Sequence, residues 1–267
     1  MKVIDCAVSA AAVIPALKKA GINVVVRYFG LASSWKTADK AECNALRKAG
    51  IDLVTVYETT ATMMVGSNAH ADGVAGAKTA KAGIIAAGGP ANAFVYFACD
   101  TNTQNHTAVE AYLKGAAEVL GASRVGIYGS YDVCAHALAN HSAAKAWQTL
   151  AWSSGKRLAT AALYQQNGAK PYNLGIDYDW NIVQSVDVGQ WGYVVAAPKP
   201  VPVPTATPYN RIVWGFPTAY ARLNPSIASR VLKTLAKGDK VTAVPGGTIL
   251  WAKTTVGYIL RTRLRTI

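Results

Sequence analysis

The sequence has little charge and lacks any long apolar segment. Of its 267 residues 15% are charged and 51% are hydrophobic, so the chain can bury a sizeable core as one large domain, or as one large and one small domain. No run of about 18 uncharged apolar residues is present, and we expect no membrane span. Asp5 interrupts the first apolar run, which therefore lacks the pattern of a secretory signal.

Several motifs of common enzyme classes are missing. No GxGxxG follows the first apolar run, which argues against a dinucleotide fold, and no GxSxG marks a serine nucleophile. The four histidines form no HExxH or HxxxH pattern, so we expect neither a metal site nor a cofactor. The four cysteines form no CxxC pair and have apolar neighbours, which is typical of buried thiols.

Acidic residues are scarce in the last part of the chain. Residues 207–267 contain ten Lys and Arg against one acid, Asp239, a net charge of +9 out of +13 for the whole chain. This asymmetry predicts a separate basic module that binds an anionic polymer, either an acidic cell wall or nucleic acid. The Pro-rich stretch 196–208 is interpreted as a semi-rigid linker. The predicted domains are therefore residues 1–195 and 209–267.

Before the linker, short apolar runs alternate with helical patterns. This order favours an α/β fold, an irregular TIM-type (β/α)8 barrel of parallel strands, with an open doubly wound sheet as the alternative. Connections after residue 147 are too short for full helices. The expected strands are 3–7, 22–30, 51–58, 92–100, 124–131, 147–154, 159–166 and 174–179, and the expected helices are 10–21, 37–50, 71–89 and 108–121. Beyond the linker, turn signals at 237–240 and 245–247 predict a small β-barrel.

Acids and amides lie at the ends of several expected strands, where the sites of such barrels form. They are Asp5, Glu58, Asp100, Gln165, Gln166, Asp177 and Asp179, and the side chains Arg27, Tyr28, Tyr57, Tyr128, Tyr131 and Trp152 lie near other strand ends. A single acid at a strand end is ordinary, but four strands that share the pattern favour a site. Carboxylates, amides and aromatic rings together suit a sugar polymer, because a carboxylic acid can protonate the glycosidic oxygen while a carboxylate stabilises the developing positive charge.

The order of these segments resembles the glycoside-hydrolase-like domain of unknown function 1906, whose relatives are the family 25 glycoside hydrolases, lysozyme-like muramidases. The resemblance covers about residues 3–193 and rests on VIDCA, RYFG, AGIDLVTVYE, GVAGAKTAKAG, VYFACD, VGIYGSY, WQTLAWSSG, LYQQ and GIDYDWN. It implies a lysozyme-type barrel that cuts peptidoglycan glycan, with Asp5 as the first-strand acid, Asp100 as the general acid and Asp177 as the last-strand acid. The muramidases carry D-x-E on strand four, where this chain reads Ala98-Cys99-Asp100, and Glu58 is the candidate for the missing carboxylate.

Residues 221–244 and 249–264 resemble a bacterial SH3-like domain, which implies binding to cell-wall polymer. A barrel of this type followed by such a module resembles a phage endolysin, a bacteriolytic protein made in the cytoplasm that acts on the bacterial wall after release. We therefore expect a monomeric, muramidase-like peptidoglycan hydrolase without nucleic-acid or membrane partners.

The candidate residues divide into catalytic and substrate-binding groups. Asp100 is the predicted acid, and Glu58 or Asp5 is the second carboxylate. The predicted substrate-binding residues are Asp177, Tyr28, Arg27, Tyr128, Trp152 and Gln165. One alternative is a non-catalytic wall-binding protein on a degenerate barrel, motivated by the absent D-x-E. Nucleic-acid binding ranks last, because few aromatic residues are interleaved with the basic residues of the tail.

Overall fold

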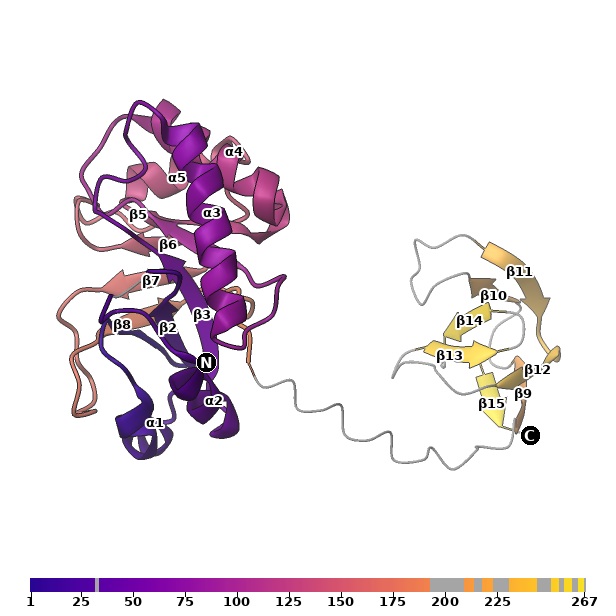
Figure 1. Cartoon of the computed structure of the whole chain (residues 1–267). Helices are drawn as coiled ribbons and strands as arrows, with labels where there is room; N and C mark the ends of the chain where they lie inside the picture. Colours follow the sequence, from indigo (N-terminus) through magenta and orange to yellow (C-terminus); the bar gives the residue numbers. More distant parts are fainter. Residues whose placement is uncertain are drawn as a thin grey trace. The chain divides into compact units, whose positions relative to one another are not determined.

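The computed structural model describes residues 1–31, 34–192, 209–213, 218–222, 231–243, 251–254, 257–260 and 264–266. It divides into two compact units, Met1–Val194 and Val195–Ile267 (Figure 1). The stretch 196–208 predicted as a linker and the turn predicted at 245–247 lie outside the described residues.

The first unit is a closed barrel of eight strands, which confirms the predicted α/β barrel (Figure 1). The strands are β1 (Val3–Asp5), β2 (Val24–Tyr28), β3 (Asp52–Tyr57), β4 (Val95–Ala98), β5 (Val125–Gly129), β6 (Lys145–Thr149), β7 (Leu163–Gln166) and β8 (Asp179–Val183). Neighbours from β1 to β7 pair in parallel, and β8 pairs antiparallel with both β7 and β1. The prediction that all strands are parallel is therefore wrong for β8.

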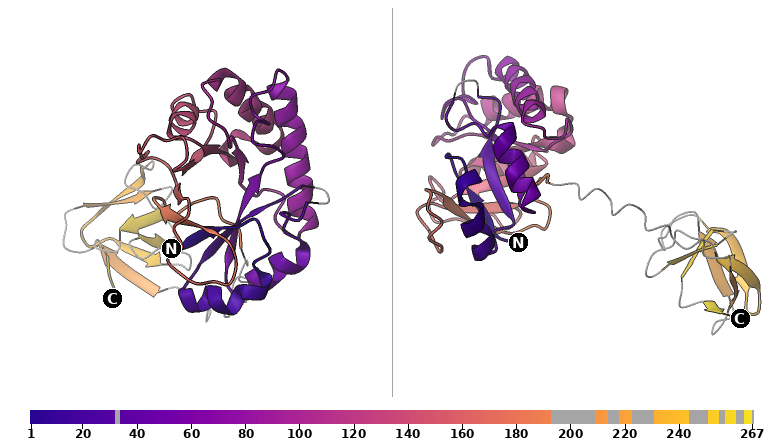
Figure 2. Two further views of the ribbon diagram at one scale, coloured as in Figure 1. Left: turned by 90° about the vertical axis from the view of Figure 1, so that its left-hand side faces the viewer. Right: turned by 60° about the horizontal axis from the view of Figure 1, so that its bottom comes forward.

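The helices of the first unit follow one another around the outside of the barrel between β1 and β6 (Figure 2). They are α1 (Ile14–Ala20), α2 (Lys40–Lys48), α3 (Ala69–Ala86), α4 (His106–Leu120) and α5 (Tyr131–Ala139). Pro15 fits in the first turn of α1, where its missing N–H has no helical partner to lose. The connections from β6 to β8 contain no helix, as their short length predicts.

The eighth strand begins later than the sequence predicts. Residues 174–178 lie outside any strand, and β8 occupies Asp179–Val183. The connection from β7 contains no helix to carry the chain back along the outside of the barrel, so the chain turns at the carboxyl end of β7 and returns antiparallel. Asp179 therefore starts β8 at the end of the barrel where the other strands finish, and its register partner is Asp5.

The interior of the barrel is filled by side chains. Alternate residues of each strand point inward, and three inward aromatic rings pack edge to face along the barrel. The ring of Trp147 lies 5.9 Å from that of Tyr96 and 4.5 Å from that of Tyr128, measured between centroids. Gly126 leaves room for this packing, since a Cβ there would lie 2.7 Å from the Tyr96 ring. The barrel interior is a packed core and not a pore, and the sites of such barrels form at the carboxyl ends of the strands.

All four cysteines are buried and free, as predicted. The early strands, among them residues 3–5 and 24–28, are buried because helices cover one face of the barrel wall and the barrel core covers the other. Within the described part of the chain, no helix combines the length and the apolar character needed to cross a membrane.

The second unit contains a seven-stranded antiparallel sheet in the order β11-β10-β14-β13-β12-β9-β15. Its strands are β9 (Tyr209–Val213), β10 (Thr218–Arg222), β11 (Val231–Ala236), β12 (Lys240–Ala243), β13 (Trp251–Thr254), β14 (Gly257–Leu260) and β15 (Leu264–Thr266). The turn predicted at 237–240 separates β11 from β12. The SH3-like assignment of this unit stays a prediction.

Candidate active site

Inward-facing side chains at the carboxyl end of the barrel are mostly acidic or aromatic. The structure brings together Asp5, Tyr28, Glu58, Asp100, Tyr128, Gln165 and Asp179. Each comes from a different strand or from the residues directly after it, so the closed barrel gathers side chains that are far apart in the sequence. Five of the predicted side chains, those of Asp5, Tyr28, Glu58, Asp100 and Tyr128, interact electrostatically with one another.

Asp5 is held by two side-chain amides on neighbouring strands. Gln165 Nε2 donates to Asp5 Oδ1 at 2.8 Å, and Asn181 Nδ2 donates to Asp5 Oδ2 at 2.7 Å. Gln165 Nε2 also lies 3.2 Å from Asp179 Oδ2, so one amide group bridges two carboxylates. The Tyr128 hydroxyl donates to Gln165 Oε1 at 2.7 Å and fixes the amide from its other side.

The indole of Trp147 determines how this network is oriented. Its N–H can only donate, and it donates to Asn181 Oδ1 at 2.7 Å. The amide nitrogen of Asn181 must then face Asp5, which therefore accepts rather than donates at Oδ2. A residue deep in the barrel core thus fixes the hydrogen-bonding role of a carboxylate at its end.

Asp5 has an unusual affinity for a proton. Only 9% of the residue is exposed, and burial raises its pKa from 3.8 to about 7. The negative charge of Asp179 acts in the same direction, whereas the bonds from Asn181 and Gln165 favour the ionised form and oppose the rise.

Glu58 and Asp100 form a second carboxylate pair, at the ends of β3 and β4, and both are half-buried. Burial raises the pKa of Glu58, and the charge of Asp100 raises it further, against the opposing effects of Lys36 and Tyr28. Burial also raises the pKa of Asp100, which Lys36 and Tyr128 lower. Because the repulsion between the two carboxyl groups is mutual, ionisation of either one makes the other harder to ionise.

The two tyrosines beside these carboxylates remain protonated hydroxyls. Burial raises the pKa of Tyr28, and the charges of Glu58, Asp5 and Asp100 add to the rise. Burial likewise raises the pKa of Tyr128 well above its ordinary value, with Asp100 as the next cause. Both can donate hydrogen bonds to a carboxylate or to a sugar oxygen at any physiological pH.

Arg27 does not join the site, contrary to the prediction that it binds substrate. It precedes Tyr28 in β2 and therefore points to the opposite side of the barrel, where it contacts Glu42 of α2. Its side chain is fully buried, with Arg27 Nε 2.7 Å from Glu42 Oε1. Arg27 Nη1 also donates to the carbonyls of Cys6 at 2.6 Å and Ala7 at 2.9 Å. Arg27 thus fastens the chain that follows Asp5.

Asp177 also lies apart from the carboxylates, although the sequence predicts it as the substrate-binding acid of the last strand. Its side chain is 84% exposed and pairs with Lys170 in the loop before β8. Asp179 takes the place at the end of the barrel, where it faces Gln165 and accepts from the backbone N–H of Gly168 at 3.1 Å. The reversed direction of β8 explains the difference, because its first residue and not the residues before it reaches this end.

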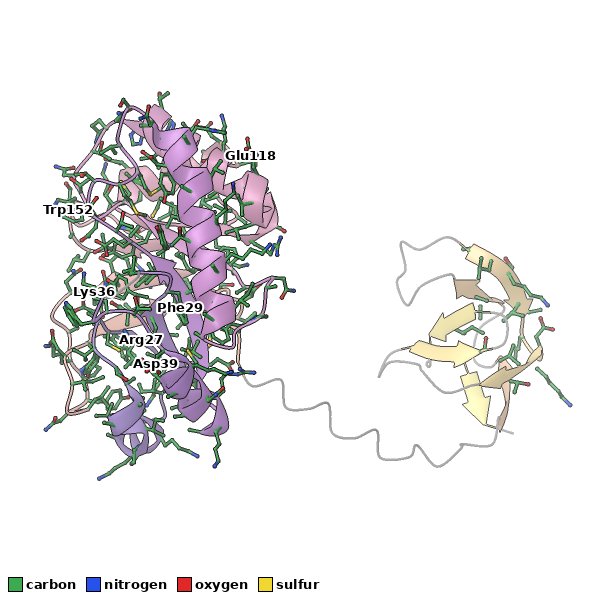
Figure 3. All side chains as sticks on the ribbon, viewed as in Figure 1. Arg27, Phe29, Lys36, Asp39, Glu118 and Trp152 are labelled. Atoms are coloured by element: carbon green, nitrogen blue, oxygen red, sulfur yellow. The ribbon has the colours of Figure 1, made fainter. Side chains whose placement is uncertain are left out.

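Trp152 lies in the loop after β6, with 41% of its surface exposed. Its backbone has a φ of 53°, a left-handed conformation that costs a bulky residue about 1–2 kcal/mol. The next residue, Ser153, is buried and holds the loop, since its hydroxyl donates to the Thr149 carbonyl at 2.6 Å and accepts from the Tyr131 N–H at 2.9 Å. The loop therefore presents an indole to solvent at an energetic cost. Trp152 and Lys36 lie toward the left-hand side of the first unit in Figure 3.

The described residues contain no group of three or more His, Cys, Asp and Glu side chains arranged to hold a metal ion.

Sequence reasoning missed Lys36, Trp147, Asn181 and the role of Asp179. The alternation of side chains along β8 could have identified Asn181 and Asp179 together, because residues two apart in a strand point to the same face.

Known proteins share this sequence pattern and this barrel. Residues 15–185 match the family model of the Rv2525c-like, glycoside hydrolase-like domain. The Tat-secreted protein Rv2525c of Mycobacterium tuberculosis, solved in complex with L-tartrate, is 23% identical, with a TM-score of 0.61 over 72% of this chain and 98% of that chain. The modular autolysin LytC of Streptococcus pneumoniae is 11% identical, with a TM-score of 0.51 over 67% of this chain and 46% of that chain, and it has also been solved with a synthetic peptidoglycan ligand. No curated protein sequence matches the chain.

Proposed function

Because the chain belongs to the family of Rv2525c-like, glycoside hydrolase-like domains, we propose that it is a glycoside hydrolase that cuts the glycan of peptidoglycan. The observation that carries this proposal is the convergence of four carboxyl groups on the active end of the barrel. They belong to Asp5, Glu58, Asp100 and Asp179. Glycosidases use one carboxyl group to protonate the leaving oxygen and another to support the reaction at the anomeric carbon.

The substrate class is supported by a protein of similar fold and by charge. LytC is an autolysin solved with a peptidoglycan ligand, and the second unit of this chain contains the basic region 207–267, which has a net charge of +9. A basic module is attracted to the anionic polymers of bacterial walls. We propose that the second unit holds the barrel on the wall and that the protein acts outside the membrane.

Glu58 and Asp100 are the proposed acid and base pair. The resemblance to muramidases implies Asp100 as the proton donor, but we propose the reverse assignment, because a glutamate carboxyl group has the higher ordinary pKa, 4.5 against 3.8 for aspartate, and burial raises both. Glu58 would protonate the glycosidic oxygen, and the carboxylate of Asp100 would support the positive charge or orient water. Asp179 adds negative charge at this end of the barrel, and Asp5 adds to it only in its ionised form.

The aromatic residues are the proposed sugar contacts. Tyr28 and Trp152 offer rings on which a sugar face can stack, and the hydroxyl of Tyr128 can bond a sugar oxygen. Gln165 is fully engaged by Asp5, Asp179 and Tyr128, so it acts by positioning these groups and not by binding sugar.

Release of reducing ends from purified bacterial walls tests the proposal. Glu58→Gln and Asp100→Asn should each lower the rate by about 100-fold or more, the usual contribution of an acid or base catalyst. The control is Glu118→Gln on α4, because Glu118 is 62% exposed and pairs with His70. Undiminished release of reducing ends by both variants would exclude Glu58 and Asp100 as the acid and base. Wall binding by the unaltered protein without any release would instead establish a non-catalytic wall-binding function.

An aryl glycoside of a chito-oligosaccharide separates the roles of the two residues. An activated leaving group needs no proton, so Glu58→Gln should lose far less activity on this substrate than on walls, whereas Asp100→Asn should lose activity on both. The opposite pattern would restore Asp100 as the proton donor.

A further inference from the structure

The loop between β2 and α2 carries a cation to the carboxylates. Lys36 Nζ lies 5.1 Å from the centroid of the Tyr28 ring, a cation–π contact at the end of β2. The same charge acts on both Glu58 and Asp100, at the ends of the next two strands. Neither the sequence motifs nor the family resemblance gives Lys36 a role.

The backbone around Lys36 is fixed beside Tyr28. Thr37 forms a β-bridge with Tyr28, and the N–H of Ala38 donates to the Tyr28 carbonyl at 2.9 Å. The Thr37 hydroxyl donates to the Leu31 carbonyl at 2.7 Å and fastens the loop to itself. The backbone that carries Lys36 is therefore held by hydrogen bonds to the end of β2, beside Tyr28, which places the lysine next to the site.

The groups that face this pair come from several strands. Asp100, Lys36 and Tyr28 act on Glu58, while Lys36 and Tyr128 act on Asp100. The tyrosines are neutral, so Lys36 is the positive group among these interactions. Without it, burial and mutual repulsion would raise the pKa of both carboxyl groups further, so a carboxylate would form only at higher pH.

We propose that Lys36 is a positioning residue that keeps the pair of Glu58 and Asp100 singly ionised, as one carboxylic acid and one carboxylate. Its catalytic meaning rests on the proposed function, whereas the charge arrangement can be measured without any hydrolysis. A glycosidase needs this mixed state, because the acid and the carboxylate act in the same step.

The test is an NMR titration of side-chain carboxyl carbons in the full-length protein. Signals of Glu58 and Asp100 are assigned by their loss in Glu58→Gln and Asp100→Asn. Lys36→Met removes the charge and keeps a side chain of similar length, Lys36→Arg keeps the charge, and Lys40→Met is the control for net charge. Lys40 is exposed and begins α2, close in sequence and outside the site.

In Lys36→Met, both carboxyl groups should titrate at higher pH, with acid dissociation constants lowered by up to about tenfold, the small end of the range for a nearby opposite charge. Lys36→Arg should retain most of the original behaviour, and Lys40→Met should change neither titration. If the protein hydrolyses walls, the pH profile of the rate should move upward in Lys36→Met and return in Lys36→Arg.

Unchanged titrations in Lys36→Met, or equal changes in Lys40→Met, would overturn the proposal. Should Lys36→Met fail to fold, Lys36→Gln makes the same comparison with a polar neutral side chain. A protein that shows the predicted titrations but no wall hydrolysis would refute the proposed function and leave the role of Lys36 in place.

Discussion

The two sides of the active end hold their carboxylates by different means. On the side of β1, β7 and β8, one amide of Gln165 bridges Asp5 and Asp179, and Asp5 is closed off from solvent. On the side of β3 and β4, Glu58 and Asp100 are half-buried, with a lysine beside them. On the first side, both oxygens of Asp5 accept hydrogen bonds and its carboxyl group is shut away from solvent, whereas the carboxyl groups of the second side remain partly exposed. Carboxyl groups thus belong to a buried hydrogen-bond network on one side and remain accessible to solvent on the other.

Gln165→Glu should break the bridged side most severely. It places a third carboxylate between Asp5 and Asp179, in a strand position that is 4% exposed. We expect a loss of about 3–5 kcal/mol in the free energy of unfolding at pH 8, because a buried charge without a partner is left behind. Urea unfolding at pH 8 and pH 5 measures it, and the loss should shrink at the lower pH.

The matched control is Gln166→Glu, which changes the next residue of the same strand. Gln166 is half-buried and points to the other face of β7, so its stability change should stay within about 0.5 kcal/mol. Equal losses of stability in the two variants would show that the bridge of Gln165 between Asp5 and Asp179 does not cause the loss.

The pH dependence of stability should reveal Asp5. Burial raises its pKa in the folded protein to about 7, from an ordinary 3.8 in the unfolded chain. Between these values the folded state binds more protons, so stability falls as the pH rises through this window, by at most about 1.4 kcal/mol per pH unit and about 4 kcal/mol in all. Asp5→Asn should flatten this fall. Free energies of unfolding from pH 4 to pH 8 measure it, and equal slopes in both proteins would contradict the assignment.

The bond from Trp147 to Asn181 should contribute a smaller amount. A double-mutant cycle with Trp147→Phe and Asn181→Ala separates the hydrogen bond from the loss of ring volume. We expect a coupling energy of about 1 kcal/mol, the usual net value of a buried hydrogen bond. Additive effects of the two changes would show that the indole does not orient Asn181.

The side of β3 and β4 should show the smallest change in the free energy of unfolding. Lys36→Met is expected to change the free energy of unfolding by less than about 0.5 kcal/mol, because partly exposed charge pairs contribute little. Thermal and urea unfolding of this variant beside Lys40→Met measure the change. A loss above about 1 kcal/mol would mean that Lys36 belongs to the scaffold and would remove the contrast between the two sides.

The early strands of the barrel could be predicted because they are apolar on both faces. Residues 22–30 and 51–58 contain β2 and β3 with little error, since helices cover one side and the barrel core the other. β8 could not be predicted in the same way, because Asp179 and Asn181 give it polar side chains that point inward. Its direction depends on the connection after β7, which the strand sequence itself does not contain.

The residues of the candidate site can be predicted from the sequence only when the alternation of inward and outward side chains along each strand is taken into account. Asp5, Glu58 and Asp100 all point inward, and the sequence identifies them as strand-end acids. Arg27 was misplaced because it lies one residue from the inward Tyr28 and so faces α2. Lys36 has no signal in the sequence, since its position depends on a bridge between a loop and β2.

The reversed eighth strand also decides where the first unit begins and ends. Trp191 exchanges backbone hydrogen bonds with Leu53, at 2.7 and 2.8 Å, near the start of β3. The N–H of Lys2 bonds the side chain of Asn23, just before β2. Both ends of this unit therefore lie opposite the carboxylates. The reversed strand β8 returns the chain to that end of the barrel, as a helix does in a regular barrel. A circular permutant that joins residues 1 and 192 would leave the end with the carboxylates unobstructed, and so would a fusion at either end of the first unit.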